Sequence, residues 1–138
     1  MRILAYGGVG IEILGHDGIN RMQTEDVVLE ELLIEGHYTE GKVVFIHDLA
    51  GANHAGDIVR CRIVSSCDNV TGLSIKGVAD LDVYSGIIAS TKGMNASSVL
   101  ITQGVYTTDW SHRIRFFGTH ISWYGGQTEG VCKDTRKN

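Results

Sequence analysis

The chain has 138 residues, of which 43% are hydrophobic and 20% charged, with a formal net charge of −4 and an isoelectric point near 5.8. This balance fits one globular domain, excludes wholesale disorder and disfavours a nucleic-acid binder, which needs a basic stripe. No apolar run reaches the roughly 18 residues of a membrane span, and the start of the chain shows no signal-peptide pattern. With 18 glycines and no proline, the sequence predicts many tight turns.

A short alternating apolar pair recurs along the chain and predicts β-strands, because its period is two and its runs are short. After the first copy, the stretch from Gly15 to Gln23 leaves room for a short helical turn. The copies are Ile11-Glu12-Ile13, Val44-Phe45-Ile46, Leu73-Ser74-Ile75 and Val99-Leu100-Ile101, and a last one begins at Val131.

A second pattern of six residues carries apolar or small residues at its first, fourth and sixth positions. Its first copy lies within Thr24 to Glu35, which by composition alone would also suit an amphipathic helix, but its alignment with three strand-like copies favours a strand. The copies begin 29, 25 and 33 residues apart. They are Leu29 to Ile34, Ile58 to Ile63, Val83 to Ile88 and Phe116 to Ile121.

The connections between the two patterns differ in one informative way. The step from the end of the six-residue pattern to the next alternating pair is 10, 10, 11 and 10 residues, whereas the return step is 18, 14, 10 and 17 residues. Insertions that gather on one side of a repeating unit are typical of a solenoid. We therefore predict an all-β fold, a short right-handed parallel β-helix of about four coils.

Stacking of equivalent positions predicts three internal columns, because each inward side chain lies on its counterpart in the neighbouring coil. The isoleucine column is the most regular of the three. The predicted columns are Leu29, Ile58, Val83 and Phe116; Leu32, Cys61, Gly86 and Thr119; and Ile34, Ile63, Ile88 and Ile121.

Three segments resemble coils of the pectin-lyase-like right-handed β-helix superfamily. They are Glu-Glu-Leu-Leu-Ile-Glu-Gly (30–36), Val-Thr-Gly-Leu-Ser-Ile-Lys-Gly (70–77) and Gly-Thr-His-Ile-Ser-Trp (118–123), and the resemblance covers residues 11 to 131. It implies the architecture and says little about function, since the superfamily includes polysaccharide lyases and hydrolases, surface adhesins and bacteriophage tailspikes. Residues 1–132 are expected to form one domain and residues 133–138 a polar tail.

A helix of about four coils is shorter than is usual in this superfamily, and the pattern starts and stops within a coil. We therefore expect the solenoid to be incomplete at both ends. Because open strand edges invite pairing with other strands, we expect a homo-oligomer or a place in a larger β-helix assembly, without nucleic acid or a membrane span.

The variable connections hold most of the chemically useful side chains. Tyr106, Asp109, Trp110 and His112 are candidates for glycan binding, because aromatic faces and hydroxyl-binding side chains suit sugar rings. Asp57 and Asp80 could form the carboxylate pair of a hydrolase, and Asp80 with Arg60 or Arg113 the base and cation of a lyase.

Two further patterns carry weaker signals. His47 and Asp48 should point to opposite sides of an extended chain, so their adjacency predicts no dyad. Three cysteines (Cys61, Cys67, Cys132) form no paired ligand motif, and no metal site or cofactor is predicted.

Three functions follow as hypotheses. The first is a structural or receptor- or glycan-binding component of a virion tailspike, fibre or cell-surface appendage, which would place the protein on a virion or outside the cell. The second is a polysaccharide lyase or glycoside hydrolase, or part of one, acting along the variable-loop face. The third is a structural domain without a ligand.

Overall fold

The computed structural model describes residues 1–22, 24–38, 40–49, 53–65, 70–90, 97–106 and 110–123. Within these residues the chain forms twelve strands and no helix. The strands of neighbouring coils pair in parallel, and the coils stack as a β-solenoid of about four turns. The predicted all-β solenoid is therefore confirmed.

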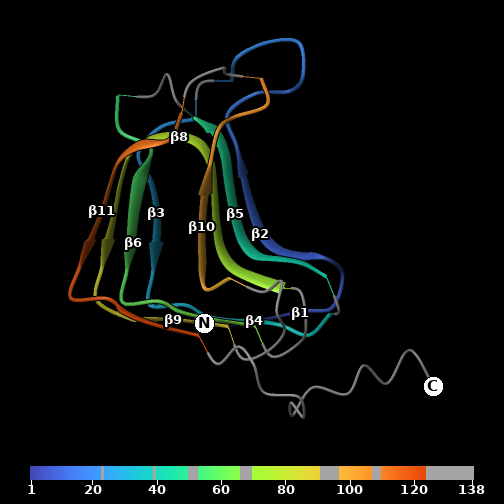
Figure 1. Cartoon of the computed structure of the whole chain (residues 1–138), viewed down its shortest axis with the longest axis vertical. Helices are drawn as coiled ribbons and strands as arrows, with labels where there is room; N and C mark the ends of the chain where they lie inside the picture. Colours follow the sequence, from blue (N-terminus) through green and yellow to red (C-terminus); the bar gives the residue numbers. More distant parts are fainter. Residues whose placement is uncertain are drawn as a thin grey trace.

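Each coil has three walls, which Figure 1 shows along the stack. We call the walls A, B and C. One long strand, β8 (Val70–Tyr84), runs through the corner between walls B and C and belongs to both. Wall A holds β1 (Arg2–Ala5), β4 (Leu33–Gly36), β7 (Arg62–Ser65), β9 (Ile87–Ser90) and β12 (His120–Trp123). Wall B holds β2 (Val9–Leu14), β5 (Gly41–Leu49), the first half of β8, and β10 (Val99–Thr102). Wall C holds β3 (Val27–Glu30), β6 (Gly56–Val59), the second half of β8, and β11 (His112–Phe117).

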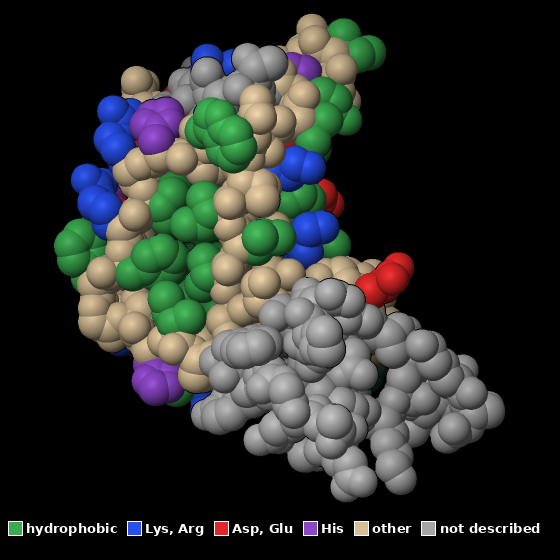
Figure 2. All heavy atoms as spheres, viewed as in Figure 1, with side chains coloured by type: hydrophobic (Ala, Val, Ile, Leu, Met, Phe, Trp, Pro, Cys, Tyr) green, Lys and Arg blue, Asp and Glu red, His purple; other side chains and the backbone are tan. Residues whose placement is uncertain are grey.

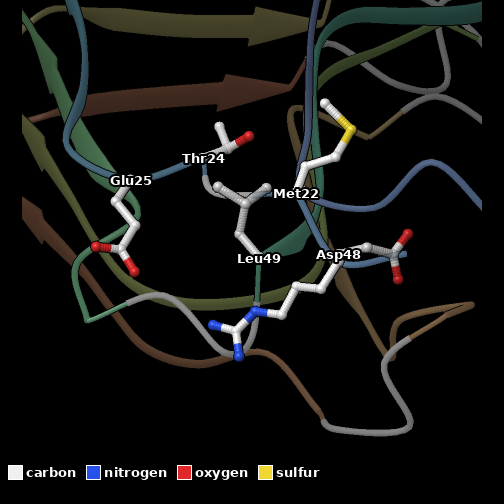
Figure 3. A pocket seen from close by; sticks show the side chains of 7 residues that line it. Met22, Thr24, Glu25, Asp48 and Leu49 are labelled. Carbon is white, nitrogen blue, oxygen red and sulfur yellow. The ribbon is translucent and has the colours of Figure 1, made fainter.

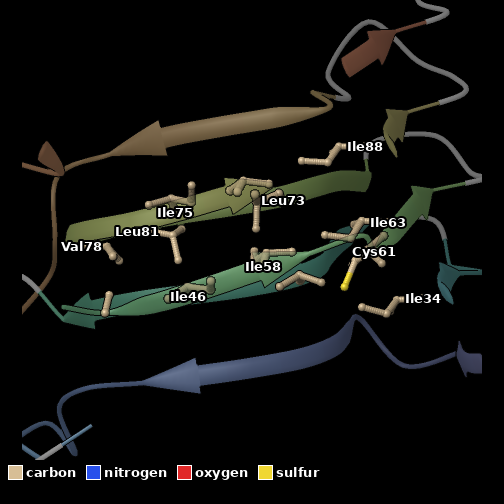
Figure 4. Close-up of a cluster of buried hydrophobic side chains, with 14 of the residues drawn as sticks. Ile34, Ile46, Ile58, Cys61, Ile63, Leu73, Ile75, Val78, Leu81 and Ile88 are labelled. Carbon is tan, nitrogen blue, oxygen red and sulfur yellow. The ribbon is translucent and has the colours of Figure 1, made fainter. Parts of the chain in front are cut away.

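The predicted columns form the core (Figure 4). On wall A, Ile34 pairs in register with Ile63, Ile63 with Ile88, and Ile88 with Ile121. On wall C, Leu29, Ile58, Val83 and Phe116 follow one another in the same way. The alternating pairs stack likewise on wall B, from Ile11 through Val44 and Leu73 to Val99. Each coil thus buries equivalent side chains against those of its neighbours.

The six-residue pattern forms two strands rather than one. Its first and fourth positions are three residues apart, and an odd spacing puts both side chains inside only if the chain turns between them. The turn is made by residues in the left-handed region: Glu31, Arg60, Ser85 and Gly118 have φ of 52°, 50°, 56° and 63°. This tight corner joins wall C to wall A in every coil.

The tight corner explains why position 86 is a glycine. Gly86 follows Ser85 with a φ of 81°, and a Cβ at Gly86 would lie 2.2 Å from the Cys61 carbonyl oxygen. Only glycine fits this close approach between two coils without displacing the backbone. Cys61 itself is buried, and burial raises the pKa of its thiol.

Three details differ from the predictions or extend them. Residues 15–22 contain bends and an antiparallel bridge between His16 and Arg21 instead of a helical turn. The isoleucine column begins one coil earlier than predicted, because Ile3 in β1 pairs with Ile34. Val131, the expected last copy of the alternating pair, lies outside the described residues together with the tail at 133–138.

The isoleucine column allows a matched test of core burial. Ile63 is 0% exposed and Ile121 is 46% exposed. We expect Ile63→Ala to lower the free energy of unfolding by about 2–5 kcal/mol, because it leaves a cavity between two coils. Ile121→Ala should cost less than half as much, since it removes less area from water. Urea denaturation measures both, and equal losses would contradict the assigned column.

Candidate functional site

The connections of variable length gather at the corner between walls B and C, which we call the loop corner. It comprises the connections from β2 to β3, from β5 to β6 and from β10 to β11, at the top of Figure 1. We number the coils by their strands in wall B, so that β2, β5, β8 and β10 belong to coils one to four. The third coil has no loop there, because β8 passes through the corner as one bent strand. This is the variable connection of the sequence, and its shortest copy is the one without a loop.

A cavity of about 330 Å³ opens at the loop corner (Figure 3). In Figure 3, Thr24 and Leu49 lie between Glu25 on one side and Met22 and Asp48 on the other. Among the described residues, no acidic side chain forms an ion pair with Arg21. Thr24 Oγ1 donates a hydrogen bond to the Leu14 carbonyl. The full lining is Gly15, Arg21, Met22, Thr24, Glu25, Asp48 and Leu49.

Asp48 connects this cavity to the loop of the fourth coil. Its carboxylate is fully buried, and Asp48 Oδ1 accepts hydrogen bonds from the backbone amides of Val105 and Tyr106 at 2.9 and 3.0 Å. Carboxylates that accept from backbone N–H groups form stronger hydrogen bonds than neutral acceptors do. The loop of coil four is therefore tied to the end of β5 in coil two.

His47 and Asp48 do interact, contrary to the prediction from alternation. His47 Nδ1 lies 3.0 Å from Asp48 Oδ2, and His47 Nε2 lies 2.8 Å from Glu12 Oε1 on the neighbouring coil. The prediction was wrong because Asp48 has a φ of 58° and leaves the extended conformation that would send the two side chains apart. An imidazole thus links a buried carboxylate to an exposed one.

Three of the proposed glycan-binding residues lie on the connection between β10 and β11, and the fourth, His112, is the first residue of β11. The Tyr106 ring stacks on His16 of the first coil, with ring centroids 4.9 Å apart and an interplanar angle of 13°. Trp110 is 68% exposed, and its carbonyl oxygen lies 3.1 Å from His112 Nδ1. Asp109 falls outside the described residues. The structure therefore brings Tyr106 to the loop corner and leaves both aromatic side chains accessible.

The proposed catalytic residues lie on the outer side of wall C and at its edge. Asp57 pairs in register with Asp82, so Asp82 rather than Asp80 is its neighbour in the next coil. Asp80 does meet Arg113, whose Nη2 lies 2.6 Å from Asp80 Oδ2. Asp57 Oδ1 lies 3.3 Å from His54 Nε2. The predicted column that pairs Ile58 with Val83 already implies this neighbour, since Asp57 and Asp82 each lie one position before that pair.

Each of these carboxylates already has a charged or titratable neighbour. Arg115 donates to both oxygens of Asp82, at 2.5 and 3.0 Å, and this pairing holds the pKa of Asp82 below its usual value of 3.8. The Tyr84 hydroxyl donates to Asp82 at 3.1 Å, and this hydrogen bond raises the pKa of Tyr84. The outer side of wall C thus holds a ladder of satisfied ion pairs.

Comparison of this chain with protein-family models, curated proteins and solved structures finds no match. In the described part of the chain, no three His, Cys, Asp or Glu side chains are grouped so that they could hold a metal ion. The same residues contain no helix long and apolar enough to cross a membrane. The interpretation of the site therefore rests on its own geometry.

The Asp82 pairing predicts how stability depends on pH. Because the folded pKa of Asp82 is lowered, its pairing with Arg115 stabilises the fold above 3.8 and is lost as the pH falls through the lowered folded value. We expect Asp82→Asn to lower the free energy of unfolding at neutral pH and to have little effect below the lowered folded pKa, where the wild-type side chain is also neutral.

Urea denaturation at both pH values measures this difference, with Glu40→Gln as a control of the same charge change on an exposed residue. A wild-type advantage over Asp82→Asn that stays constant across this range would contradict the assignment.

Proposed function

We propose that this protein is a glycan-binding β-solenoid and that the loop corner is its binding surface. The observation that carries the proposal is Tyr106, an exposed aromatic ring fixed against His16 on a loop that is tied to the cavity by Asp48. An aromatic ring offers a flat apolar face to a sugar, and nearby polar groups can bind its hydroxyls. A second exposed aromatic residue, Trp110, lies four positions further along the same connection.

The cavity suits a sugar in size and in chemistry. Its volume of about 330 Å³ lies at the lower end of the range for small-molecule sites. Arg21 can donate hydrogen bonds and Glu25 can accept them, while Met22 and Leu49 provide apolar surface. This mixture of donors, acceptors and apolar contacts is the one that a hydroxyl-rich ring requires.

The biological setting is proposed from the resemblance to β-helix coils and from apolar side chains that are exposed. We place the protein in a virion tailspike, fibre or cell-surface appendage, as part of an oligomer or larger β-helix assembly. Inward-facing Ile101 and Ile121 are 45% and 46% exposed, and Figure 2 shows hydrophobic side chains gathered inside the outline of the coil. Exposed apolar patches favour association with another surface.

A polysaccharide lyase or hydrolase is the alternative, and the neighbouring carboxylates of Asp57 and Asp82 are the observation in its favour. Adjacent strands lie about 4.8 Å apart, close to the carboxylate separation of a retaining glycosidase. Asp82 forms an ion pair with Arg115, and Asp80 forms one with Arg113, so the carboxylates of Asp82 and Asp80 are already paired with cations. Glycan binding without cleavage therefore has the stronger support.

A glycan array followed by calorimetry on the best ligand tests the proposed function. We expect Tyr106→Ala to weaken binding about tenfold, because aromatic anchors dominate such contacts. Tyr6→Ala is the matched control: Tyr6 is also exposed and stacks on a histidine, His37, but lies on another corner.

Equal losses for Tyr106→Ala and Tyr6→Ala, or no binding to any glycan, would contradict the proposal. Release of reducing ends or unsaturated uronates from the same glycans, abolished by Asp57→Asn or Asp82→Asn, would favour the enzyme instead.

A further inference from the structure

Asp48 stands at a position where the solenoid needs an unusual backbone. The register of walls B and C places Gly15 and Gly77 at the equivalent positions of the neighbouring coils. Gly77 has a φ of 63° and Asp48 a φ of 58°. Aspartate is one of the few residues besides glycine that adopts this region readily. In this column, coil two therefore carries a carboxylate where the coils on either side carry no side chain.

The left-handed backbone also redirects the Asp48 side chain. Val44 and Ile46 of the same strand point into the core, and strict alternation would send Asp48 there as well. Instead, the carboxylate reaches the amides of Val105 and Tyr106. A buried carboxylate is tolerated only where it is hydrogen-bonded, and these two amides supply donors from a loop 57 and 58 residues later in the chain.

The missing loop of coil three makes this contact possible. Because β8 crosses the corner without a loop, the loop of coil four can fold back over coil three and reach coil two. The Tyr106 ring then reaches coil one, where it stacks on His16. The backbone of Tyr106 is thus held by one coil and its ring by another.

We propose that Asp48 is the positioning residue of the loop corner. Its carboxylate fixes the segment at Val105 and Tyr106 over the first and second coils, and so holds the Tyr106 ring against His16 in its ligand-binding position. This inference rests on the proposed glycan-binding function for its ligand, but the anchoring of the loop can be measured without any ligand.

Amide hydrogen exchange tests the anchoring directly. In the wild-type protein the amides of Val105 and Tyr106 should be protected although they lie in a loop. Asp48→Ala should speed their exchange about tenfold or more, because it removes a charged acceptor from both. Asp48→Asn keeps an oxygen that can accept and should retain part of the protection. Glu12→Ala is the control, since it removes the other partner of His47 and touches neither amide.

A double-variant cycle tests positioning. If Asp48 acts through Tyr106, the variant with both Asp48→Ala and Tyr106→Ala should bind glycan no more weakly than Tyr106→Ala alone, within about twofold. Asp48→Asn should recover part of the affinity lost in Asp48→Ala, and Glu12→Ala should bind like the wild type.

The possible outcomes separate the two proposals. Unprotected amides in the wild type, or additive losses of affinity, would overturn the role of Asp48 whatever the ligand. Protected amides that open in Asp48→Ala, in a protein that binds no glycan, would support the anchoring and overturn the glycan-binding function. If Asp48→Ala does not fold, exchange in the wild type and in Asp48→Asn decides the question.

Discussion

In-register stacking of the coils is the constraint on which the rest of this structure depends. Each inward side chain lies on its equivalent about 4.8 Å away, so the position of a residue in its coil determines what it contacts. The isoleucines of wall A show this most clearly, since Ile34, Ile63 and Ile88 are all buried and paired in register. Insertions are tolerated only where they leave the stack intact, and the corner between walls B and C meets that condition.

The loop corner is a consequence of the same constraint. Loops that leave successive coils at one corner lie one above another, and the coil without a loop leaves space for its neighbour to cross. Tyr106 of coil four therefore meets His16 of coil one, although 90 positions separate them in the sequence. The uniform core does little to distinguish one coil from another. The proposed function lies in the differences between the loops.

The sequence predicted the repeating part of the fold well and its exceptions poorly. Columns such as Ile34, Ile63 and Ile88 follow from spacing, because burial repeats once per coil. The interaction of His47 with Asp48 could not be predicted by alternation, since it depends on a left-handed backbone at Asp48. The tight corner at Arg60, by contrast, could have been predicted from the odd spacing within the six-residue pattern. Two inward residues that are three positions apart require a turn between them.

Contacts between isoleucine methyl groups test the central claim most directly. In a nuclear Overhauser spectrum of protein labelled at isoleucine δ1 methyls, the stack predicts cross-peaks from Ile34 to Ile63 and from Ile63 to Ile88. It predicts none from Ile34 to Ile88, which lie two coils apart at about 9.6 Å, twice the strand spacing. Absence of the first two cross-peaks, or a strong cross-peak between Ile34 and Ile88, would contradict the stacked solenoid.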